Sequence, residues 1–375
     1  MRIAVNTRLL LQGKLEGIGW FSKETLSRVV KNHPEHEFIF FFDRPYSEEF
    51  VFAPNVTPVV VAPQARHPFL YITWTEVSIP RMLRKYKADV YFSPEGLGSL
   101  RTKVPTCITI HDLAFLHYPG FADKLHTWFN SRYQPRFAKK AKQIVAVSEY
   151  TKSDVIDKYG IAPEKISVVY NGAHQEYRPL DYETKKSIKE QYTDGKEYFI
   201  FTSAIHPRKN VVNLLKAFVQ FKRRQKSGMK LVIVGRMAWQ TDEIEKAKRL
   251  MPFKEDVIWT GYLDVKELAR VTAAAYAMVY PSLFEGFGIP IVEAMQCEVP
   301  VITSTTSSMP EVGGDAALLA DPEKPEDIAE KMGMIYKDER LRARLVAAAR
   351  EQAQKFSWDK SAEALWEVIM KCKES

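Results

Sequence analysis

The sequence predicts an α/β protein in which two domains, each built on a doubly wound parallel sheet, follow one another along 375 residues. Short β-branched or aromatic runs alternate with helical stretches, which is the pattern of a parallel sheet covered by helices. This alternation stops at a polar stretch and then starts again. The chain is also longer than one hydrophobic core usually organises, so two domains are expected.

The first series of strand-like runs ends near residue 170. Its runs are residues 2–8, 37–42, 89–93, 107–111, 143–148 and 166–170. A polar stretch over residues 178–196 follows, with Pro179, Asp181 and Gly195 as turn residues. We therefore predict an N-terminal domain over residues 1–178.

The second series of strand-like runs lies within residues 179–355, the predicted C-terminal domain. Its runs are residues 198–203, 230–234, 256–259, 277–280 and 299–303. Residues 325–372 lack strand signals and are rich in Ala, Glu, Lys and Leu at helical spacing, so this part is predicted to be helical. Ser357 interrupts it as a plausible N-cap, which sets residues 356–375 apart as a last helix.

The cysteines and the apolar runs favour a cytoplasmic protein. Cys107, Cys297 and Cys372 are odd in number, widely spaced and without a metal-ligand pattern, which favours a reducing compartment. Residues 1–11 have no small-residue cleavage site and contain Arg8, so they are interpreted as a strand instead of a signal peptide. No run approaches the roughly 20 apolar residues of a membrane-spanning helix.

The positive charge of the chain is concentrated in its N-terminal half. The net charge is +8, and residues 1–175 contain 23 Lys and Arg against 16 Asp and Glu. Basic and aromatic or apolar side chains interleave at residues 81–87 and 132–142. Such segments suit anionic lipid headgroups, diphosphate-bearing acceptors or nucleic acid, and a solvated basic helix face is an equal alternative. No nucleic-acid motif is present, so no nucleic-acid partner is expected.

The segment 281–295 carries the most informative residues, because it follows an apolar strand and opens a helix. Gly286 and Gly288 leave backbone N–H groups unobstructed, and Pro290 suits the first turn of a helix. Such a turn favours a phosphate or a sugar hydroxyl. Glu293 can accept two hydroxyl hydrogen bonds, as a ribose offers, and Glu285 can contact a sugar ring. The alternative makes Glu285 a surface residue and Glu293 a helix-face charge.

Two further groups follow strands at positions where open α/β sheets bind ligands. Arg208 and Lys209 are adjacent cations before the helical stretch 211–222, an unfavourable placement unless an anion such as a diphosphate lies there. They are otherwise ordinary solvated cations. His111, with Asp112, ends the run 107–111 and is either a site residue or a structural histidine.

Other motifs are weak or missing. Gly17 and Gly19 follow the first strand, but Ser22 stands at the third glycine position of a dinucleotide fingerprint. The sequence contains no phosphate-binding loop of the Gly-x-x-x-x-Gly-Lys type, no His-Glu-x-x-His and no spaced Cys/His set. We therefore expect no obligatory metal, and Arg208, Lys209 and helix N-termini to stabilise a leaving diphosphate.

Together these segments resemble glycosyltransferase family 4, retaining enzymes with the GT-B fold, in which two Rossmann-like domains face each other across a cleft. The Glu-x7-Glu element of Glu285 and Glu293 is the most specific match. The other matching segments are Gly17-Ile-Gly19, His111-Asp112-Leu113, Val147-Ser148-Glu149-Tyr150-Thr151, Asn171-Gly172, Pro207-Arg208-Lys209-Asn210 and Phe356-Ser357-Trp358.

The resemblance implies a role for each candidate residue. Glu293 holds the ribose of a nucleotide sugar, and Arg208 with Lys209 holds its diphosphate. The transferred sugar contacts Glu285, His111 and the backbone amides of Gly286-Phe287-Gly288. Gly17 and Gly19 join the donor site from the first domain. Many members of the family carry an arginine where this chain has Ser203 and Ala204. Arg208 beside Lys209 is the arrangement of a subset that includes many mannosyltransferases, which favours GDP-mannose.

The resemblance also implies a reaction and a place in the cell. The acceptor hydroxyl attacks from the face that the diphosphate leaves, and a donor phosphate oxygen takes its proton. We expect a glycan or lipid-linked acceptor of cell-surface polysaccharide synthesis, and peripheral contact with anionic lipid at the inner face of the plasma membrane. The last helix is expected to return to the first domain. The alternatives are a nucleotide-sugar epimerase, a phosphorylase-like protein, or a non-catalytic subunit that binds a sugar nucleotide or a lipid.

Overall fold

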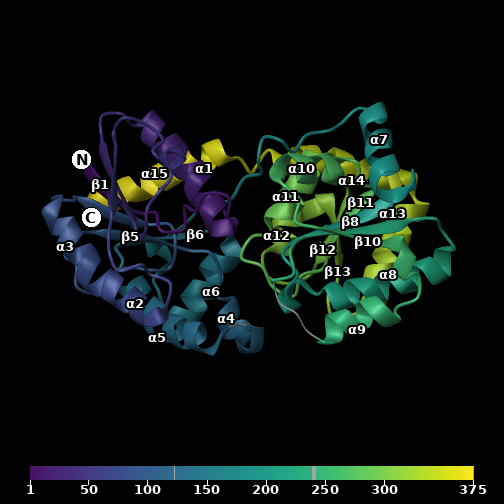
Figure 1. Ribbon diagram of the computed structural model, residues 1–375, viewed down its shortest axis with the longest axis horizontal. Coiled ribbons are helices and arrows are strands. Elements are labelled where there is room, and N and C mark those ends of the chain that lie inside the picture. Colours follow the sequence, from purple (N-terminus) through teal and green to yellow (C-terminus); the bar gives the residue numbers. More distant parts are fainter. Residues whose placement is uncertain (122, 239–241, 375) are drawn as a thin grey trace. The chain divides into compact units, whose positions relative to one another are not determined.

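The computed structural model describes residues 1–121, 123–238 and 242–374, and the chain divides into two compact units (Figure 1). The first unit comprises Met1–Asn171 and Ser357–Ser375, and the second comprises Gly172–Phe356. Each unit contains one parallel sheet with helices packed against it, which confirms the predicted α/β fold class.

The sheet of the first unit has seven strands in the order β3-β2-β1-β4-β5-β6-β7. Their bounds are β1 (Arg2–Asn6), β2 (Glu37–Phe42), β3 (Val56–Val60), β4 (Val90–Ser93), β5 (Thr106–Ile110), β6 (Gln143–Ala146) and β7 (Ile166–Val168). The central strands are buried on both faces, so they read as continuous apolar runs. The sequence analysis missed β3, because Pro58 and half-exposed side chains make this edge strand a weak pattern.

The helices of the first unit begin and end at recognisable residues. Asp123 accepts hydrogen bonds from the first turn of α5, and Ser148 does so for α6, which Gly160 ends in the left-handed conformation. The bounds are α1 (Gly17–Asn32), α2 (Pro68–Thr73), α3 (Ile79–Lys85), α4 (Ala114–His117), α5 (Lys124–Lys140), α6 (Glu149–Tyr159) and α15 (Trp358–Glu374), with a π-helical turn at Trp74–Ser78 and 3₁₀ turns at Glu48–Phe50, Pro119–Phe121 and Pro163–Lys165.

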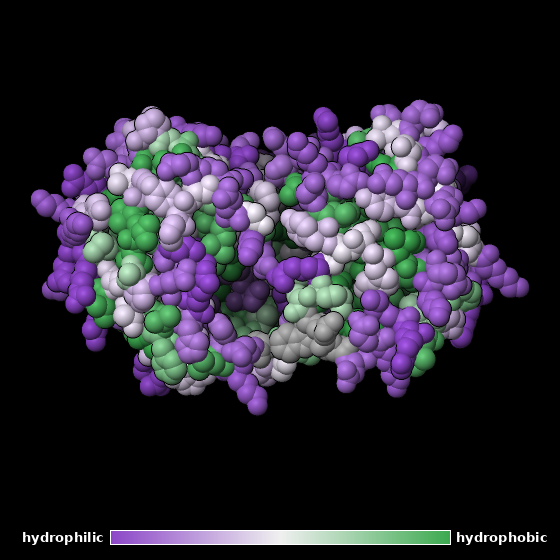
Figure 2. Space-filling model, viewed as in Figure 1, coloured by the Kyte–Doolittle hydropathy of each residue, from purple (hydrophilic) through white to green (hydrophobic). Residues whose placement is uncertain are grey.

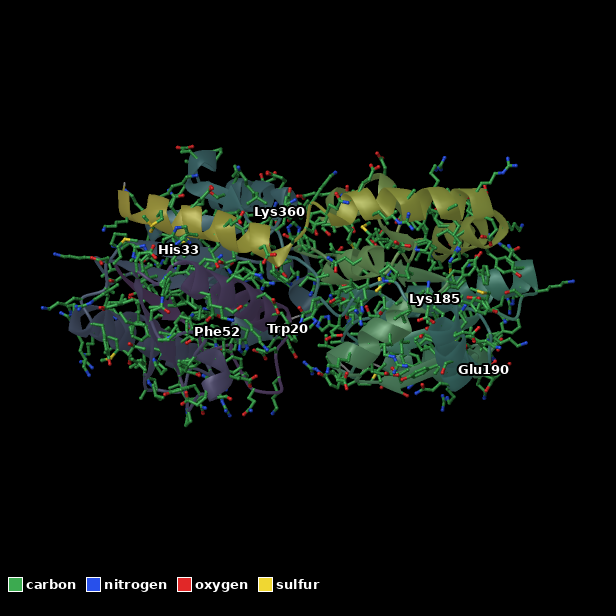
Figure 3. The ribbon with its side chains drawn as sticks, turned by 90° about the horizontal axis from the view of Figure 1, so that it is seen from above. Trp20, His33, Phe52, Lys185, Glu190 and Lys360 are labelled. Carbon is green, nitrogen blue, oxygen red and sulfur yellow. The ribbon has the colours of Figure 1, made fainter. Side chains whose placement is uncertain are left out.

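Helix α15 returns from the second unit to the core of the first, where it packs beside α1 (Figure 1). Leu365 and Ile369 are fully buried in the cluster that contains the β1 side chains. His33, labelled in Figure 3, lies at the end of α1. Its ring stacks on that of Trp366 in α15 with the ring centroids 3.8 Å apart. The Oγ atom of Ser357 accepts a hydrogen bond from the Lys360 amide at 3.2 Å, which confirms the predicted N-cap.

The second unit has a six-stranded parallel sheet in the order β10-β9-β8-β11-β12-β13. Its strands are β8 (Tyr198–Thr202), β9 (Lys230–Val234), β10 (Val257–Gly261), β11 (Ala277–Tyr280), β12 (Val301–Ser304) and β13 (Ala317–Ala320). Its helices are α7 (Tyr182–Thr193), α8 (Val211–Gln225), α9 (Asp242–Leu250), α10 (Val265–Ala273), α11 (Ile289–Gln296), α12 (Met309–Gly313), α13 (Pro325–Lys337) and α14 (Glu339–Ala353), with 3₁₀ turns at Pro207–Lys209, Lys254–Asp256 and Gly314–Ala316. The sequence analysis missed β13, because its Ala-Leu-Leu-Ala sequence has no β-branched residue.

The first boundary between the units lies at residues 171 and 172, seven residues before the predicted boundary at 178 and 179. Residues 172–178 belong to the second unit because Tyr177 is 5% exposed there and its hydroxyl hydrogen-bonds to Glu293 in α11. The polar stretch expected as a linker also contains α7. Its N-cap is Asp181, which accepts a hydrogen bond from the Thr184 amide at 2.8 Å.

No helix in the described ranges combines the length and the apolar composition needed to cross a bilayer. All three cysteines are buried, and none forms a disulfide.

Candidate functional site in the second unit

The loop between β11 and α11 forms a sharp entry into a helix at the carboxyl end of a central strand. Gly288 has φ +97°, a left-handed conformation that favours glycine, and a Cβ atom there would lie 3.0 Å from Ile291. Pro290 lies in the first turn of α11, as predicted. The loop therefore turns directly from a buried strand into the N-terminus of a helix, whose first amides point toward its entrance.

Glu285 lies in this loop and is held by three donors. Its carboxylate is 3.0 Å from Arg208 Nη1 and 2.6 Å from Lys209 Nζ, and Tyr280 donates a hydrogen bond to it at 2.9 Å. Only 8% of the carboxylate side chain is exposed. Burial alone would raise its pKa, but Lys209 and Arg208 outweigh burial and lower the pKa of Glu285 to about 2. Glu285 is therefore an anion throughout the neutral range and not a solvated surface residue.

Arg208 and Lys209 lie in the 3₁₀ turn that precedes α8, and backbone contacts tie this turn to the Glu285 loop. Arg208 donates to the Phe284 carbonyl at 2.6 Å, and the Leu283 amide donates to the Arg208 carbonyl at 2.8 Å. The Asn210 side chain is buried and donates to the Pro281 carbonyl at 2.9 Å. An anion was expected beside the two cations, and in this structure Glu285 occupies that place.

Three supporting residues were not identified from the sequence. The Glu285 amide donates to Ser307 Oγ at 3.0 Å, and the Ser308 hydroxyl lies 3.0 Å from the carbonyls of Glu285 and Phe287. Tyr280, the last residue of β11, bridges Lys209 and Glu285. A run of Ser and Thr over residues 303–308, which begins in the last two residues of the buried strand β12, was the sequence signal for the two serines.

Glu293 lies on α11, eight residues after Glu285 in the sequence, and its carboxyl group is largely shielded from water. Burial raises the pKa of Glu293 to about 7, and a hydrogen bond from the Tyr177 hydroxyl counteracts only part of this rise. The Glu293 side chain is partly accessible to solvent. Because a carboxylate in such surroundings lacks strong partners, it can gain two hydrogen bonds from a vicinal diol.

The remaining predicted residues belong to the first unit. His111 follows β5, and its Nε2 atom lies 2.8 Å from the Pro94 carbonyl, so Nε2 carries the proton. Burial lowers the pKa of His111, which leaves Nδ1 as a hydrogen-bond acceptor at neutral pH. Gly17 and Gly19 lie in the first turn of α1. Gly19 is required by packing, because a Cβ atom there would lie 3.0 Å from the Leu9 carbonyl oxygen, whereas Gly17 borders open space.

The described residues contain no group of three or more His, Cys, Asp and Glu side chains arranged to hold a metal ion. Asp181 and Glu183, the pair nearest in sequence to an Asp-x-Asp motif, lie at the start of α7, where Asp181 caps the helix.

Comparison with known proteins agrees with the division of the chain into two units. Residues 17–177 match the family "Glycosyltransferase Family 4", and residues 183–352 match "Glycosyl transferases group 1". The O-antigen chain mannosyltransferase B of Escherichia coli is 26% identical over 92% of this chain and 93% of its own length. The O-antigen chain mannosyltransferase RfbU of Salmonella typhimurium is 27% identical over 74% of this chain and 75% of its own.

Solved structures share the fold at lower sequence identity. A sucrose-phosphate synthase from Thermosynechococcus elongatus superposes with a TM-score of 0.79 over 99% of this chain and 98% of its own, at 16% identity. The two family matches together span both units and include every candidate residue. The chain therefore belongs to glycosyltransferase family 4 and is a glycosyltransferase with the GT-B fold.

Proposed function

We propose that this glycosyltransferase moves mannose from GDP-mannose, with retention of the anomeric configuration, to a glycan or lipid-linked acceptor during cell-surface polysaccharide synthesis. The two curated relatives described above are named O-antigen chain mannosyltransferases, which supports both the sugar and the pathway. The side of the membrane that fits this chemistry is the cytoplasmic face, where nucleotide sugars are made.

The observation that carries the proposal is the carboxylate of Glu285 between two cations. A donor diphosphate is negatively charged, as the Glu285 carboxylate is. Arg208 and Lys209, before the start of α8, are therefore its natural partners. In the free protein Glu285 supplies that negative charge. When the donor binds, the phosphates take over part of these contacts, and Glu285 becomes free to accept hydrogen bonds from sugar hydroxyls.

The rest of the donor has matching partners on α11 and its entry loop. Glu293 accepts both ribose hydroxyls, and the amides of Gly286, Phe287 and Gly288 bind the sugar and the phosphate next to it. His111 offers an unprotonated Nδ1 atom to a sugar hydroxyl, and Gly17 lies in a helix turn open to a ligand. With two cations and a helix N-terminus around the leaving group, the reaction needs no obligatory metal ion and no other cofactor.

The proposed reaction breaks the bond between the anomeric carbon and the diphosphate oxygen. The acceptor oxygen forms the new bond on the same face of the sugar, and its proton passes to the departing phosphate oxygen. Arg208 and Lys209 stabilise the charge that develops on the diphosphate, which lowers the barrier. Glu285 is not required as a proton donor, because its low pKa keeps it ionised.

The experiment is a transfer assay with GDP-mannose and a mannose-terminated oligosaccharide, followed by NMR of the product's anomeric carbon. An α-linked product from the α-donor is expected, with GDP release that depends on the acceptor. Inversion at the anomeric carbon would contradict retention. Conversion or hydrolysis of GDP-mannose without an acceptor would instead favour the epimerase alternative, and transfer from UDP or ADP sugars alone would overturn the choice of donor.

We further propose that the first unit contacts anionic lipid through α2 and α5. Phe69 is 59% and Trp128 47% exposed, and their rings lie 6.4 Å apart between the two helices. Figure 2 shows apolar residues at the surface over this part of the first unit. The basic residues of α5 are Lys124, Arg132, Arg136, Lys139 and Lys140, and the helix itself contains no acidic residue. Exposed aromatic rings beside cations fit a bilayer interface.

Sedimentation with vesicles of phosphatidylglycerol and phosphatidylcholine tests this contact. Phe69→Ser with Trp128→Ser is expected to reduce binding without a change in the melting temperature, since both rings are exposed. The matched control is Tyr182→Ser with Tyr262→Ser, two exposed rings of the second unit. Equal binding to vesicles with and without phosphatidylglycerol would overturn the proposal.

A further inference from the structure

A cavity of about 280 Å³ lies in the first unit, at the carboxyl ends of β1 and β2. It is lined by residues that follow the two strands and by Arg66 from the loop after β3. Open parallel sheets bind ligands at this edge. The lining residues are Leu10, Leu11, Gln12, Lys14, Arg44, Pro45, Tyr46, Ser47 and Arg66, and the cavity is called the Lys14–Arg66 pocket below.

The charge of the Lys14–Arg66 pocket is one-sided. Three cations and no acidic residue line it, and neither Lys14 nor Arg66 forms a salt bridge within the described ranges. A second cavity, at the amino ends of the same strands, shows the contrast. There Arg2 and Lys87 share the wall with three carboxylates, of Glu35, Glu37 and Asp89. Arg44 pairs with the buried Asp43, but the charges of Lys14 and Arg66 lack the compensation that the second cavity has.

Buried groups hold the third cation of the pocket in a fixed orientation. The fully buried carboxylate of Asp43 binds Arg44 through Nε at 2.6 Å and Nη2 at 2.7 Å, and also accepts the Ala65 amide. This leaves the Nη1 group of Arg44 for another partner. A fixed guanidinium edge with two exposed cations beside it is a geometry that matches the oxygens of a phosphoryl group.

We propose that the Lys14–Arg66 pocket binds a phosphoryl group of the acceptor. This proposal rests on the proposed function, because it concerns the acceptor of the same reaction. The pocket adjoins β1 and β2, whereas His111 follows β5, three strands from β2. With strands about 4.8 Å apart, the phosphoryl group is held roughly 10–15 Å from the sugar-binding end of that edge. The acceptor therefore carries its phosphate or diphosphate away from the hydroxyl that reacts.

Titration calorimetry with inorganic pyrophosphate, at fixed ionic strength and with saturating GDP, tests the pocket directly. Lys14→Gln with Arg66→Gln is expected to weaken pyrophosphate binding about tenfold or more, since two charge-assisted contacts are lost. Both residues are exposed, so the fold should be unchanged. The matched control is Lys31→Gln with Lys103→Gln, two exposed lysines of the same unit with the same change in net charge. Wild-type affinity in the pocket variant, equal loss in the control, or no binding by the wild type would overturn the proposal.

Two transfer assays distinguish the possible sources of the phosphoryl group. With a soluble oligosaccharide that ends in an alkyl diphosphate, a higher acceptor KM in the pocket variant indicates a phosphoryl group on the acceptor itself. An unchanged KM, combined with weaker sedimentation on phosphatidylglycerol vesicles, indicates a lipid headgroup and overturns the assignment to the acceptor. Pyrophosphate binding is measured without turnover, so the pocket can be tested separately from the reaction. If the protein binds pyrophosphate through Lys14 and Arg66 but transfers no mannose, the result contradicts the proposed function and leaves the phosphoryl site standing.

Discussion

The Nζ atom of Lys209 lies 2.6 Å from the carboxylate of Glu285, and Arg208 contacts the other carboxylate oxygen. In the free protein the single carboxylate of Glu285 thus offsets one of the two positive charges of the candidate diphosphate site. Both partners are mostly buried, so removing one of them leaves an uncompensated charge.

Glu285→Gln is expected to lower the free energy of unfolding by about 3 kcal/mol, because two mostly buried cations lose their anion. The same variant should gain a larger rise in melting temperature from GDP than the wild type, since the nucleotide restores the missing charge. Thermal unfolding with and without GDP measures both effects. Glu298→Gln, which removes an exposed ion pair with Arg350, is the control and should change little. A smaller GDP shift in Glu285→Gln would contradict this account.

The stability of the protein should depend on the ionisation of Glu293. Its pKa is about 7 in the folded protein and near 4.5 in the unfolded chain, so between these values the folded state binds more protons. The contribution of this carboxyl to stability therefore falls as the pH rises from 4.5 to 7. Glu293→Gln should lack this dependence, and its stability relative to the wild type should increase from pH 5 to pH 8. Urea unfolding at several pH values checks this, and a constant difference would be the contrary result.

Donor binding should show the opposite dependence on pH, because the ionised Glu293 accepts both ribose hydroxyls. Affinity for GDP-mannose, whose diphosphate keeps its charges in this range, should rise between pH 6 and pH 8. Tyr177→Phe removes the hydrogen bond that favours the carboxylate form, so the midpoint of this rise should move to higher pH. Calorimetry of both proteins gives the two midpoints. Identical midpoints would show that Tyr177 does not influence Glu293.

Ser308→Ala is expected to weaken donor binding indirectly, because Ser308 supports the Glu285 loop and is not itself expected to contact the donor. The hydroxyl of Ser308 lies 3.0 Å from the carbonyls of Glu285 and Phe287, and its loss should destabilise the protein by about 1–2 kcal/mol. A looser loop should raise the KM for GDP-mannose more than it lowers kcat. Steady-state kinetics separate the change in KM from the change in kcat. The control is Ser227→Ala, a serine in the turn after α8 that lies outside the site.

Leu365→Ala tests the role of α15 in the first unit. Leu365 is fully buried in the cluster that contains the β1 side chains, so the truncation should cost about 2–5 kcal/mol. The exposed neighbour substitution Glu363→Ala should cost less than about 0.5 kcal/mol. Thermal unfolding followed by circular dichroism compares the two variants, and equal midpoints would argue against a structural role for this helix.

Most of the fold was predictable from the sequence because buried parallel strands produce continuous apolar runs. The runs at residues 107–111 and 277–280 correspond to β5 and β11, and Ser357 caps the last helix. The missed strands lie where that signal is weak. Val56–Val60 contains Pro58, and Ala317–Ala320 lacks β-branched residues, so their pairing partners decide their conformation.

The residue types of the candidate site were also predictable, but their contacts were not. The adjacent cations Arg208 and Lys209 indicated an anion, yet only the fold brings Glu285, 76 residues further along the chain, to Lys209. Burial raises the pKa of Glu293, and the hydroxyl that limits this rise belongs to Tyr177, which was predicted to lie in the other domain. Long-range packing of this kind leaves no local pattern in a single sequence.

Binding of GDP to the wild type, to Glu293→Ala and to Arg208→Ala with Lys209→Ala tests the central claim most directly. Calorimetry should show tight binding of GDP and weaker binding of UDP and ADP by the wild type. Each variant should lose GDP affinity by at least about tenfold while it remains folded. Undiminished GDP affinity in both variants would contradict the assignment of the donor site to the second unit.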